Sequence, residues 1–225
     1  MVRNHKSGYN LIYDKILLVL KTSICQFLHT LLSRKRAVIA MKIIELTRIV
    51  PETLWAARFE GNEENEFDRT FNCWEDTEYL EAFFTLHEQD LTKDFYGYCS
   101  VSQAISITMS EADEFERQLL RVAKGQDLEK KLGDIFKPLD KTVRIKIVNE
   151  KSKAYGTGAK SWLRIYAVRL NHNFFVISGS AIKLTKTMNE REHLKGELEK
   201  LNVLVRFLKE LNIETVEDWG YIDFE

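Results

Sequence analysis

The chain has 225 residues, of which 44% are apolar and 30% are charged, the balance of a globular protein with a sizeable core. Two prolines and ten glycines are too few for a collagenous, linker-rich or disordered chain. The three cysteines lie at positions 25, 73 and 99 and form no CxxC motif, which disfavours a disulfide scaffold and a cysteine zinc site. We therefore expect a protein of the reducing cytoplasm.

Charge is unevenly distributed along the chain, although the total is only −1. Residues 1–40 carry a net charge of +6, and residues 41–140 carry −11. Residues 141–189 carry +9, with Glu150 as their only acidic residue, and residues 190–225 carry −5. A basic block inside an acidic chain predicts a local binding site for a polyanion. The alternative is that its cations are scattered over a solvated surface.

We expect residues 1–40 to be an extension outside the folded domain. Lys21 interrupts the apolar run of this segment, which leaves it short of the roughly 20 apolar residues of a transmembrane helix. Met41 precedes an alternating apolar pattern, so we predict that translation begins there and that residues 41–225 form a single α+β domain. The alternative for residues 1–40 is a basic amphipathic helix that lies on a membrane surface.

The acidic part of this domain, residues 41–127, is predicted to be mostly helical. Two short strands, at 41–50 and 54–59, precede apolar residues that recur at helical spacing from 67 to 91. Further helices are expected to begin at Ser100 and at Ser110, the second with a side-chain cap on Ser110 and a stop at Gly125. No ExxH motif accompanies the carboxylates of this part, so we expect a solvated face and neither a metal nor a cofactor; they are Glu75, Asp76, Glu78 and Glu81.

The basic part, residues 128–225, is predicted to be a twisted antiparallel sheet followed by an amphipathic helix. After a short helix at 128–136, alternating strands are expected at 143–148 and 161–170. A hairpin turn at 171–173 leads to a return strand that begins at Phe174 and bends near Gly179. A stripe of leucines predicts the final helix, at 189–212.

Period-two counting gathers basic and aromatic side chains on one face of this sheet: Arg144, Lys146, Trp162, Arg164, Tyr166 and Lys183. Cations neutralise phosphates and aromatic rings stack on bases, so this face predicts nucleic-acid binding, with Arg164 and Lys183 exposed. The alternative for Trp162 and Tyr166 is packing beneath a helix.

Three stretches carry a family resemblance: Trp162-Leu-Arg-Ile-Tyr-Ala-Val, Phe174-Phe-Val-Ile-Ser-Gly-Ser-Ala-Ile-Lys-Leu-Thr-Lys-Thr187 and Glu190-Arg-Glu-His-Leu-Lys-Gly-Glu-Leu. An arginine-bearing strand, a hydrophobic return strand, a Lys-x-x-Lys-Thr segment and a helix that opens with acidic residues follow in this order. Over about residues 128–209 the chain thereby resembles the HigB-like branch of the RelE/ParE superfamily of bacterial toxins. Met188 stands where that family has a proline.

The resemblance implies a RelE-like fold and a metal-independent endoribonuclease. Such toxins cleave messenger RNA, often on the ribosome, and are neutralised by an antitoxin, here expected to be a helix-turn-helix protein. Arg164 matches the family's strand arginine and is assigned to phosphate stabilisation. Lys183 and Lys186 match its basic segment and are assigned to base or electrostatic work. Tyr166 is assigned to base stacking or proton transfer.

Two further hypotheses remain open at this point. The chain contains no activated-nucleophile motif, so a non-catalytic module that binds RNA or protein on the same fold competes with the nuclease. His193 is a candidate general acid near the basic segment, or else a solvent-facing helix residue. In addition, the acidic residues 41–127 are complementary in charge to the basic block and are expected to mask it.

Overall fold

The computed structural model describes residues 41–91, 99–140, 149–185, 191–213 and 216–219. Residues Lys42–Glu225 form one compact unit with a six-stranded mixed sheet, which confirms the α+β class. The strand order is β1-β2-β6-β5-β4-β3. The strands are β1 (Ile43–Val50), β2 (Leu54–Phe59), β3 (Lys137–Pro138), β4 (Glu150–Tyr155), β5 (Leu163–Asn171) and β6 (Phe174–Ile182).

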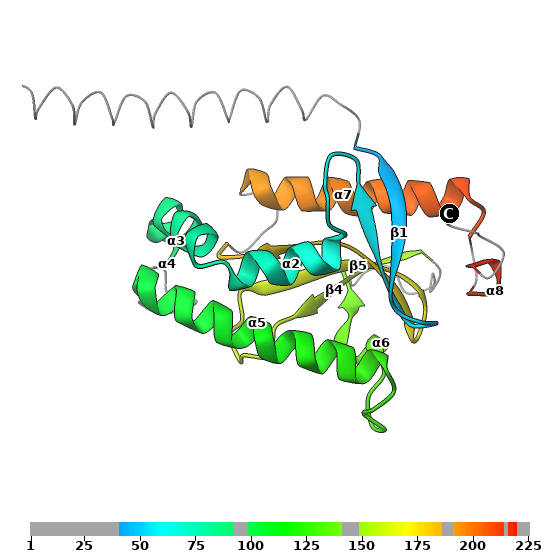
Figure 1. Ribbon diagram of the computed structural model, residues 1–225, viewed down its shortest axis with the longest axis horizontal. Coiled ribbons are helices and arrows are strands. Elements are labelled where there is room, and N and C mark those ends of the chain that lie inside the picture. The colour runs from blue at the N-terminus through cyan, green and yellow to red at the C-terminus, as the bar shows by residue number, and fades with distance from the viewer. Residues whose placement is uncertain (1–40, 92–98, 141–148, 186–190, 214–215, 220–225) are drawn as a thin grey trace, which may run out of the picture. The chain divides into compact units, whose positions relative to one another are not determined.

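Helices cover both faces of this sheet (Figure 1). They are α2 (Glu66–Glu75), α3 (Thr77–Leu86), α4 (Glu88–Leu91), α5 (Val101–Ala123), α6 (Leu132–Ile135), α7 (Glu192–Glu210) and α8 (Val216–Trp219). One core, with Trp74, Phe84 and Phe115, packs α2, α3 and α5 on one face. A second core, with Leu194 and Leu201, packs α7 on the other.

The two hairpins of the sheet follow from local sequence. β1 and β2, which match the two strands that the sequence predicts, pair across a short turn. β5 and β6 pair across His172 and Asn173, and the Asn171 side chain accepts a hydrogen bond from the Asn173 backbone N–H (2.7 Å). Between Tyr166 and Ala167 the register slips by one residue, so β6 bulges next to Gly179, where the sequence predicts a bend.

The acidic part is not a separate mask over the basic sheet. β2 pairs in parallel with β6 from Leu54 to Ala56, so β1 and β2 extend the same sheet and make it mixed rather than purely antiparallel. Phe71 and Leu119, from the acidic helices, share one core with Ile165 of β5. The acidic part therefore belongs to the same fold as the basic strands and covers one face of their sheet, and the effect on RNA affinity that the masking hypothesis expects stays a prediction.

The long helix α5 differs from the prediction at its start. A capping box on Ser100 and Gln103 begins the helix, and α5 then runs without a break through Ser110. The predicted cap on Ser110 is therefore wrong, because the Ser100 cap nucleates a helix whose apolar face continues past that residue. The predicted stop is confirmed, since Gly125 follows the helix with a φ of +68°.

Three predicted features lie outside the described residues: the extension 1–40, the strand 143–148, and the continuation of the return strand through residues 186 and 187. β4 comes from a stretch to which the sequence analysis assigned no element, and it pairs with β5 from Glu150 to Tyr155. The RelE-like topology stays a prediction. Among the described residues, no helix is long and apolar enough to cross a membrane.

A buried ion cluster joins the helices of the two faces. β2 and β6 pair only as far as Ile177, so the edge of β6 is not covered by β2 beyond that residue. There the Lys200 ammonium of α7 donates to Glu66 Oε2 of α2 (2.9 Å) and to Glu197 Oε1 of its own helix (2.9 Å). All three residues are at most 9% exposed, although they interrupt apolar faces. Burial raises the pKa of Glu197, an effect that the charge of Lys200 opposes.

Replacing Lys200 with methionine leaves the buried Glu197 carboxylate without its cation, while Glu66 keeps its ion pair with Arg69 (3.3 Å). We expect K200M to lower the free energy of unfolding by about 3–5 kcal/mol at pH 7. The loss should shrink as pH falls toward 4, because burial raises the pKa of Glu197 and protonation then removes its charge. The control is K195M, whose half-exposed ion pair with Glu192 should contribute less than about 1 kcal/mol. Urea denaturation at both pH values measures the difference, and equal effects of the two variants would contradict the prediction.

Candidate active site

Arg164 lies where the sequence predicts, on β5, but its side chain is not exposed. The residue is 8% exposed, and its Nη1 donates to the carbonyl oxygens of Ser161 (2.8 Å) and Leu163 (2.6 Å). Its guanidinium also lies 4.1 Å from the ring centroid of Tyr155. The expectation of an exposed Arg164 is wrong, because the side chain folds back onto its own strand.

The aromatic residues of the predicted binding face are core residues. Tyr166 is 1% exposed in the core under α7, and burial raises the pKa of its hydroxyl far above the ordinary value. Trp162 packs in the opposite core, where its Nε1 donates to Thr108 Oγ1 (2.9 Å) and its ring meets Phe84. The alternative of packing beneath helices is confirmed for both residues, and the shared face is wrong for Trp162.

Lys183 is half-buried at the end of β6, where its Nζ donates to the Thr185 carbonyl (2.6 Å). Arg164 pairs with Ala181, so Lys183 is the diagonal neighbour of Arg164 on the same face. Lys186, Arg144 and Lys146 lie outside the described residues. The register therefore makes these two residues neighbours, while their head groups bind different carbonyl groups.

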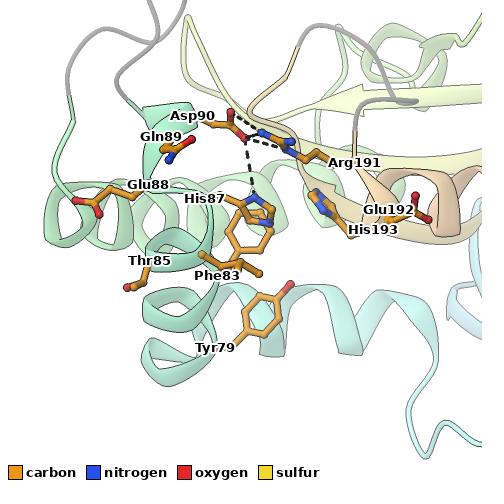
Figure 2. Close-up of a pocket in the computed structure, with 11 residues that line it drawn as sticks. Tyr79, Phe83, Thr85, His87, Glu88, Gln89, Asp90, Arg191, Glu192 and His193 are labelled. Atoms are coloured by element: carbon orange, nitrogen blue, oxygen red, sulfur yellow. Dashed lines mark hydrogen bonds and ion pairs between the residues drawn. The ribbon is translucent and has the colours of Figure 1, made fainter. Parts of the chain in front are cut away.

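A cavity of about 750 Å³ lies close to this end of β6. Two segments that are distant in sequence line it (Figure 2): one runs from α3, with Tyr79 and Phe83, through His87 to α4, and the other is the start of α7 with His193. A second cavity, of about 110 Å³, shares Tyr79, Phe83 and His193 with its walls. The polar side chains of the first cavity make it the candidate active site.

Asp90 and Arg191 connect α4 to the start of α7 across this cavity. Arg191 Nε donates to Asp90 Oδ2 (3.0 Å), and its Nη2 donates to both carboxylate oxygens (2.8 and 2.6 Å). Asp90 is 1% exposed, whereas the Arg191 side chain is 37% exposed. The bidentate pair therefore fixes the orientation of a guanidinium that still reaches the cavity surface.

Two histidines face each other beside this pair, as Figure 2 shows. The ring centroids of His87 and His193 are 5.2 Å apart, and Phe83 contacts both rings. His193 Nε2 lies 3.2 Å from the Ile182 carbonyl, which can only accept, so Nε2 carries the hydrogen and Nδ1 keeps a lone pair. His87 Nδ1 lies 3.9 Å from Asp90 Oδ2, a carboxylate that favours the charged form of His87.

The surroundings lower the pKa of both histidines. Burial is the largest cause for His87, and the nearby charges of His193 and Arg191 add to it against the opposing effect of Asp90. Burial is also the largest cause for His193, with the Ile182 hydrogen bond acting in the opposite direction. Because each protonated ring disfavours a charge on the other, the pair takes up its two protons in separate steps.

This arrangement supplies the parts of acid–base catalysis on a phosphodiester. One imidazole accepts a proton, the second donates one, and a fixed guanidinium faces developing negative charge. The start of α7 adds the positive end of a 19-residue helix, whose N-cap Arg191 makes no side-chain cap. Among the described residues, no three His, Cys, Asp or Glu side chains lie together as a metal-binding group would require.

Of this cluster, the sequence indicates only His193, as a candidate acid or else a solvent-facing helix residue. The structure places it half-buried against Phe83. His87, Asp90 and Arg191 were missed. Their only local signal is the spacing of His87 and Asp90 within one turn, and no local pattern brings residue 191 next to residue 90.

The lowered pKa values can be checked directly by NMR titration. We expect both His87 and His193 to titrate below 6.5, and D90N to lower both values further, because the carboxylate that stabilises the imidazolium forms is gone. A histidine whose pKa is lowered by folding destabilises the folded state as pH falls below 6.5, since the unfolded chain binds the proton first. A pKa above 6.5 for either ring would contradict the packing described here.

The comparisons with known proteins place the chain in no family. No family model, no curated protein and no solved structure matches it.

Proposed function

We propose that this protein is a metal-independent endoribonuclease whose acid–base pair is His87 and His193. The observation that carries the proposal is the pair itself: two imidazoles with lowered pKa values, 5.2 Å apart, beside a fixed arginine in a cavity. RNA contains its own nucleophile, the ribose 2′-hydroxyl, so its cleavage needs a base, an acid and cations but no further protein nucleophile.

The hydrogen bonds of the two rings assign their roles. His193 has Nε2–H directed at Ile182, so Nδ1 is the general base that removes the 2′-hydroxyl proton. His87 is the general acid, because its Nδ1 faces Asp90 and the carboxylate stabilises the proton-bearing form. The 2′ oxygen attacks the adjacent phosphorus, the P–O5′ bond breaks, and His87 gives its proton to the leaving 5′ oxygen. The products are a 2′,3′-cyclic phosphate and a 5′-hydroxyl.

The remaining charges fit a phosphate in the same place. Arg191 and the N-terminus of α7 stabilise the extra charge of the phosphorane. Lys183 follows Ile182, whose carbonyl binds His193, so this basic residue is the chain neighbour of the residue that orients the proposed base. Glu88 and Glu192 also line the cavity and repel a polyanion, but both are exposed, so water and salt screen the repulsion.

The resemblance of residues 128–209 to HigB-like toxins supports messenger RNA as the substrate. It also supports a toxin role under the control of an antitoxin, with cleavage on the ribosome. The proposed proton-transfer residues differ from the one that the family resemblance implies. Tyr166 is buried and its pKa is raised, so His87 and His193 take its place. Arg164 is not retained as a phosphate ligand, because its buried guanidinium donates to the Ser161 and Leu163 carbonyls, whereas Lys183 is retained as an electrostatic residue.

Glutamine at either histidine removes proton transfer and keeps a similar polar volume. We expect H87Q and H193Q each to slow RNA cleavage about 10²–10⁴-fold in the presence of EDTA. H172Q is the matched control, because His172 is exposed at the β5–β6 turn, and it should cleave at the unchanged rate. The assay uses purified full chain, a labelled messenger RNA, and reactions with and without ribosomes. An RNA with a 2′-deoxy residue at the cleaved position should stay intact.

The pH dependence follows from the two lowered pKa values. Activity requires one neutral and one protonated ring, a state that exists between the two apparent pKa values of the pair. Since both lie below 6.5, the rate should be bell-shaped with its optimum below pH 6.5 and should fall as pH rises further. D90N should move the optimum to lower pH. A profile that rises continuously to pH 9 would exclude an imidazolium as the acid.

Intact RNA under all these conditions would exclude the nuclease. The protein would then be a non-catalytic module on this fold. RNA binding that weakens as salt rises, and that is weaker in the variant R191Q, would identify it as an RNA-binding module.

A further inference from the structure

One face of β4 carries cations that α7 does not cover. Side chains alternate along a strand, so Lys151, Lys153 and Tyr155 share this face, whereas Ser152 and Ala154 are buried on the opposite one. The core beneath α7 contains side chains of β5 and β6 but none of β4. This face of β4 therefore stays partly open to solvent beside α7.

Like charges meet directly across the β3–β4 pair. Lys137 of β3 stands opposite Lys153 of β4 in the register, so the two ammonium groups share the open face. Neither has a hydrogen bond or an ion pair among the described residues. Asp134 accepts from the Lys131 backbone N–H (2.8 Å), which lowers its pKa, and Lys137 contributes to this shift without pairing with it. Opposed like charges are destabilising, and an anion held between them would remove the repulsion.

An exposed aromatic ring lies beside these lysines. Tyr155 is 43% exposed, and the Lys153 ammonium lies 5.7 Å from its ring centroid. The Arg164 guanidinium lies closer to the centroid, at 4.1 Å, but it is buried and donates to backbone carbonyls. Arg164 therefore supports the ring from the side of the sheet, and the remaining surface of the ring is open to a ligand.

The acidic residues around this face have partners or positions of their own. On α7, Glu192 pairs with Lys195 (2.7 Å). Further along the helix, Glu199 pairs with Arg206 (3.0 Å). Glu150, the one acidic residue of β4, has the parity of the opposite face. The uncompensated charge of the open face is therefore positive.

We propose that Lys137, Lys153 and Tyr155, here called the lysine–tyrosine patch, bind single-stranded RNA outside the candidate active site. The two ammonium groups hold one phosphate between them, and a neighbouring base stacks on the open surface of Tyr155. A duplex offers no unstacked base to this ring, so the patch selects single strands. The inference rests on the proposed nuclease function and adds a second binding site for the same substrate strand.

The register connects the patch to the active site. Tyr155 pairs with Arg164, and Arg164 pairs with Ala181. Ala181 precedes Ile182, whose carbonyl binds His193. Neighbouring strands lie about 4.8 Å apart, so about 10 Å separates the backbone at Tyr155 from that of β6 beside the proposed base. A short RNA strand therefore reaches both sites.

Binding of an uncleavable strand tests the stacking. The probe is a labelled 2′-O-methyl RNA of about 12 nucleotides, which lacks the 2′-hydroxyl nucleophile, and anisotropy measures its affinity for the full chain. Leucine at Tyr155 keeps an apolar cover over Arg164 but cannot stack, so we expect Y155L to weaken binding about 5–150-fold. Y155F keeps the ring and should bind as the natural protein does. Equal affinities of Y155L and Y155F would overturn the stacking role.

A duplex probe of the same sequence is the matched control for the ligand. Its bases are stacked on one another, so Y155L should bind it as tightly as Y155F does. An equal loss on the duplex and on the single strand would overturn the selection of single strands.

Salt dependence tests the two lysines separately from the ring. Removing one phosphate contact should lower the slope of log affinity against log salt by about 0.7, and we expect this change in the double variant K137Q/K153Q. K124Q/K209Q removes the same charge from exposed lysines at the ends of α5 and α7 and should keep the slope. Lysines also protect sheet edges from pairing with other chains, a role that predicts self-association but no change in slope. An unchanged slope in folded K137Q/K153Q would overturn the patch.

A minimal substrate separates this proposal from the nuclease itself. A dinucleoside monophosphate fills the active site without extending to the patch, so Y155L should cleave it at the unchanged rate and show a raised KM only for messenger RNA. Weakened binding of the single strand by Y155L without cleavage by any form of the protein supports the patch and overturns the nuclease. Cleavage of both substrates, with no effect of Y155L on cleavage or binding, overturns the patch and leaves the nuclease.

Discussion

The parting of β2 from β6 after Ile177 is the constraint on which the rest of the structure depends. A sheet with helices on both faces ordinarily separates those helices completely. Here the uncovered edge of β6 lets Glu66 of α2 meet Lys200 and Glu197 of α7 directly. The burial of two carboxylates and an ammonium is tolerated because each charge has a partner at 2.9 Å. This cluster fixes the position of α7 against α2, which apolar packing alone would leave free to slide.

The position of the active-site groups follows from that constraint. Arg191 and His193 stand at the first turn of α7, and Glu197 lies one turn further along the same helix. Asp90 ties the beginning of α7 to α4, so the helix is held by ion pairs from two other helices. His87 and His193 are thereby brought within 5.2 Å without belonging to one element or to neighbouring strands.

Because helices cover both faces of the sheet, the basic and aromatic residues of β5 do not form an exposed binding face. Arg164 and Tyr166 lie on the strand that the sequence predicts, but α7 covers their face. Their charge and aromatic surface therefore serve packing, and the proposed chemistry lies at the end of the sheet, where the Ile182 carbonyl binds His193 of α7. The proposed polyanion site is smaller than a whole sheet face.

The sequence alone determined the elements whose signals are local. Alternation predicted β1 and β5, short apolar runs predicted β2 and β6, the turn at 171–173 predicted the β5–β6 hairpin, and the leucine stripe predicted α7. It did not reveal that Glu197 and Lys200 lie inside that stripe, because two charged residues in an amphipathic helix ordinarily mark its solvated side. Only the tertiary structure decided that Glu66 stands opposite them and that His87 stands opposite His193. Such pairings join residues about a hundred positions apart, and the path of the backbone between them is set by the packing of the whole core rather than by any local pattern.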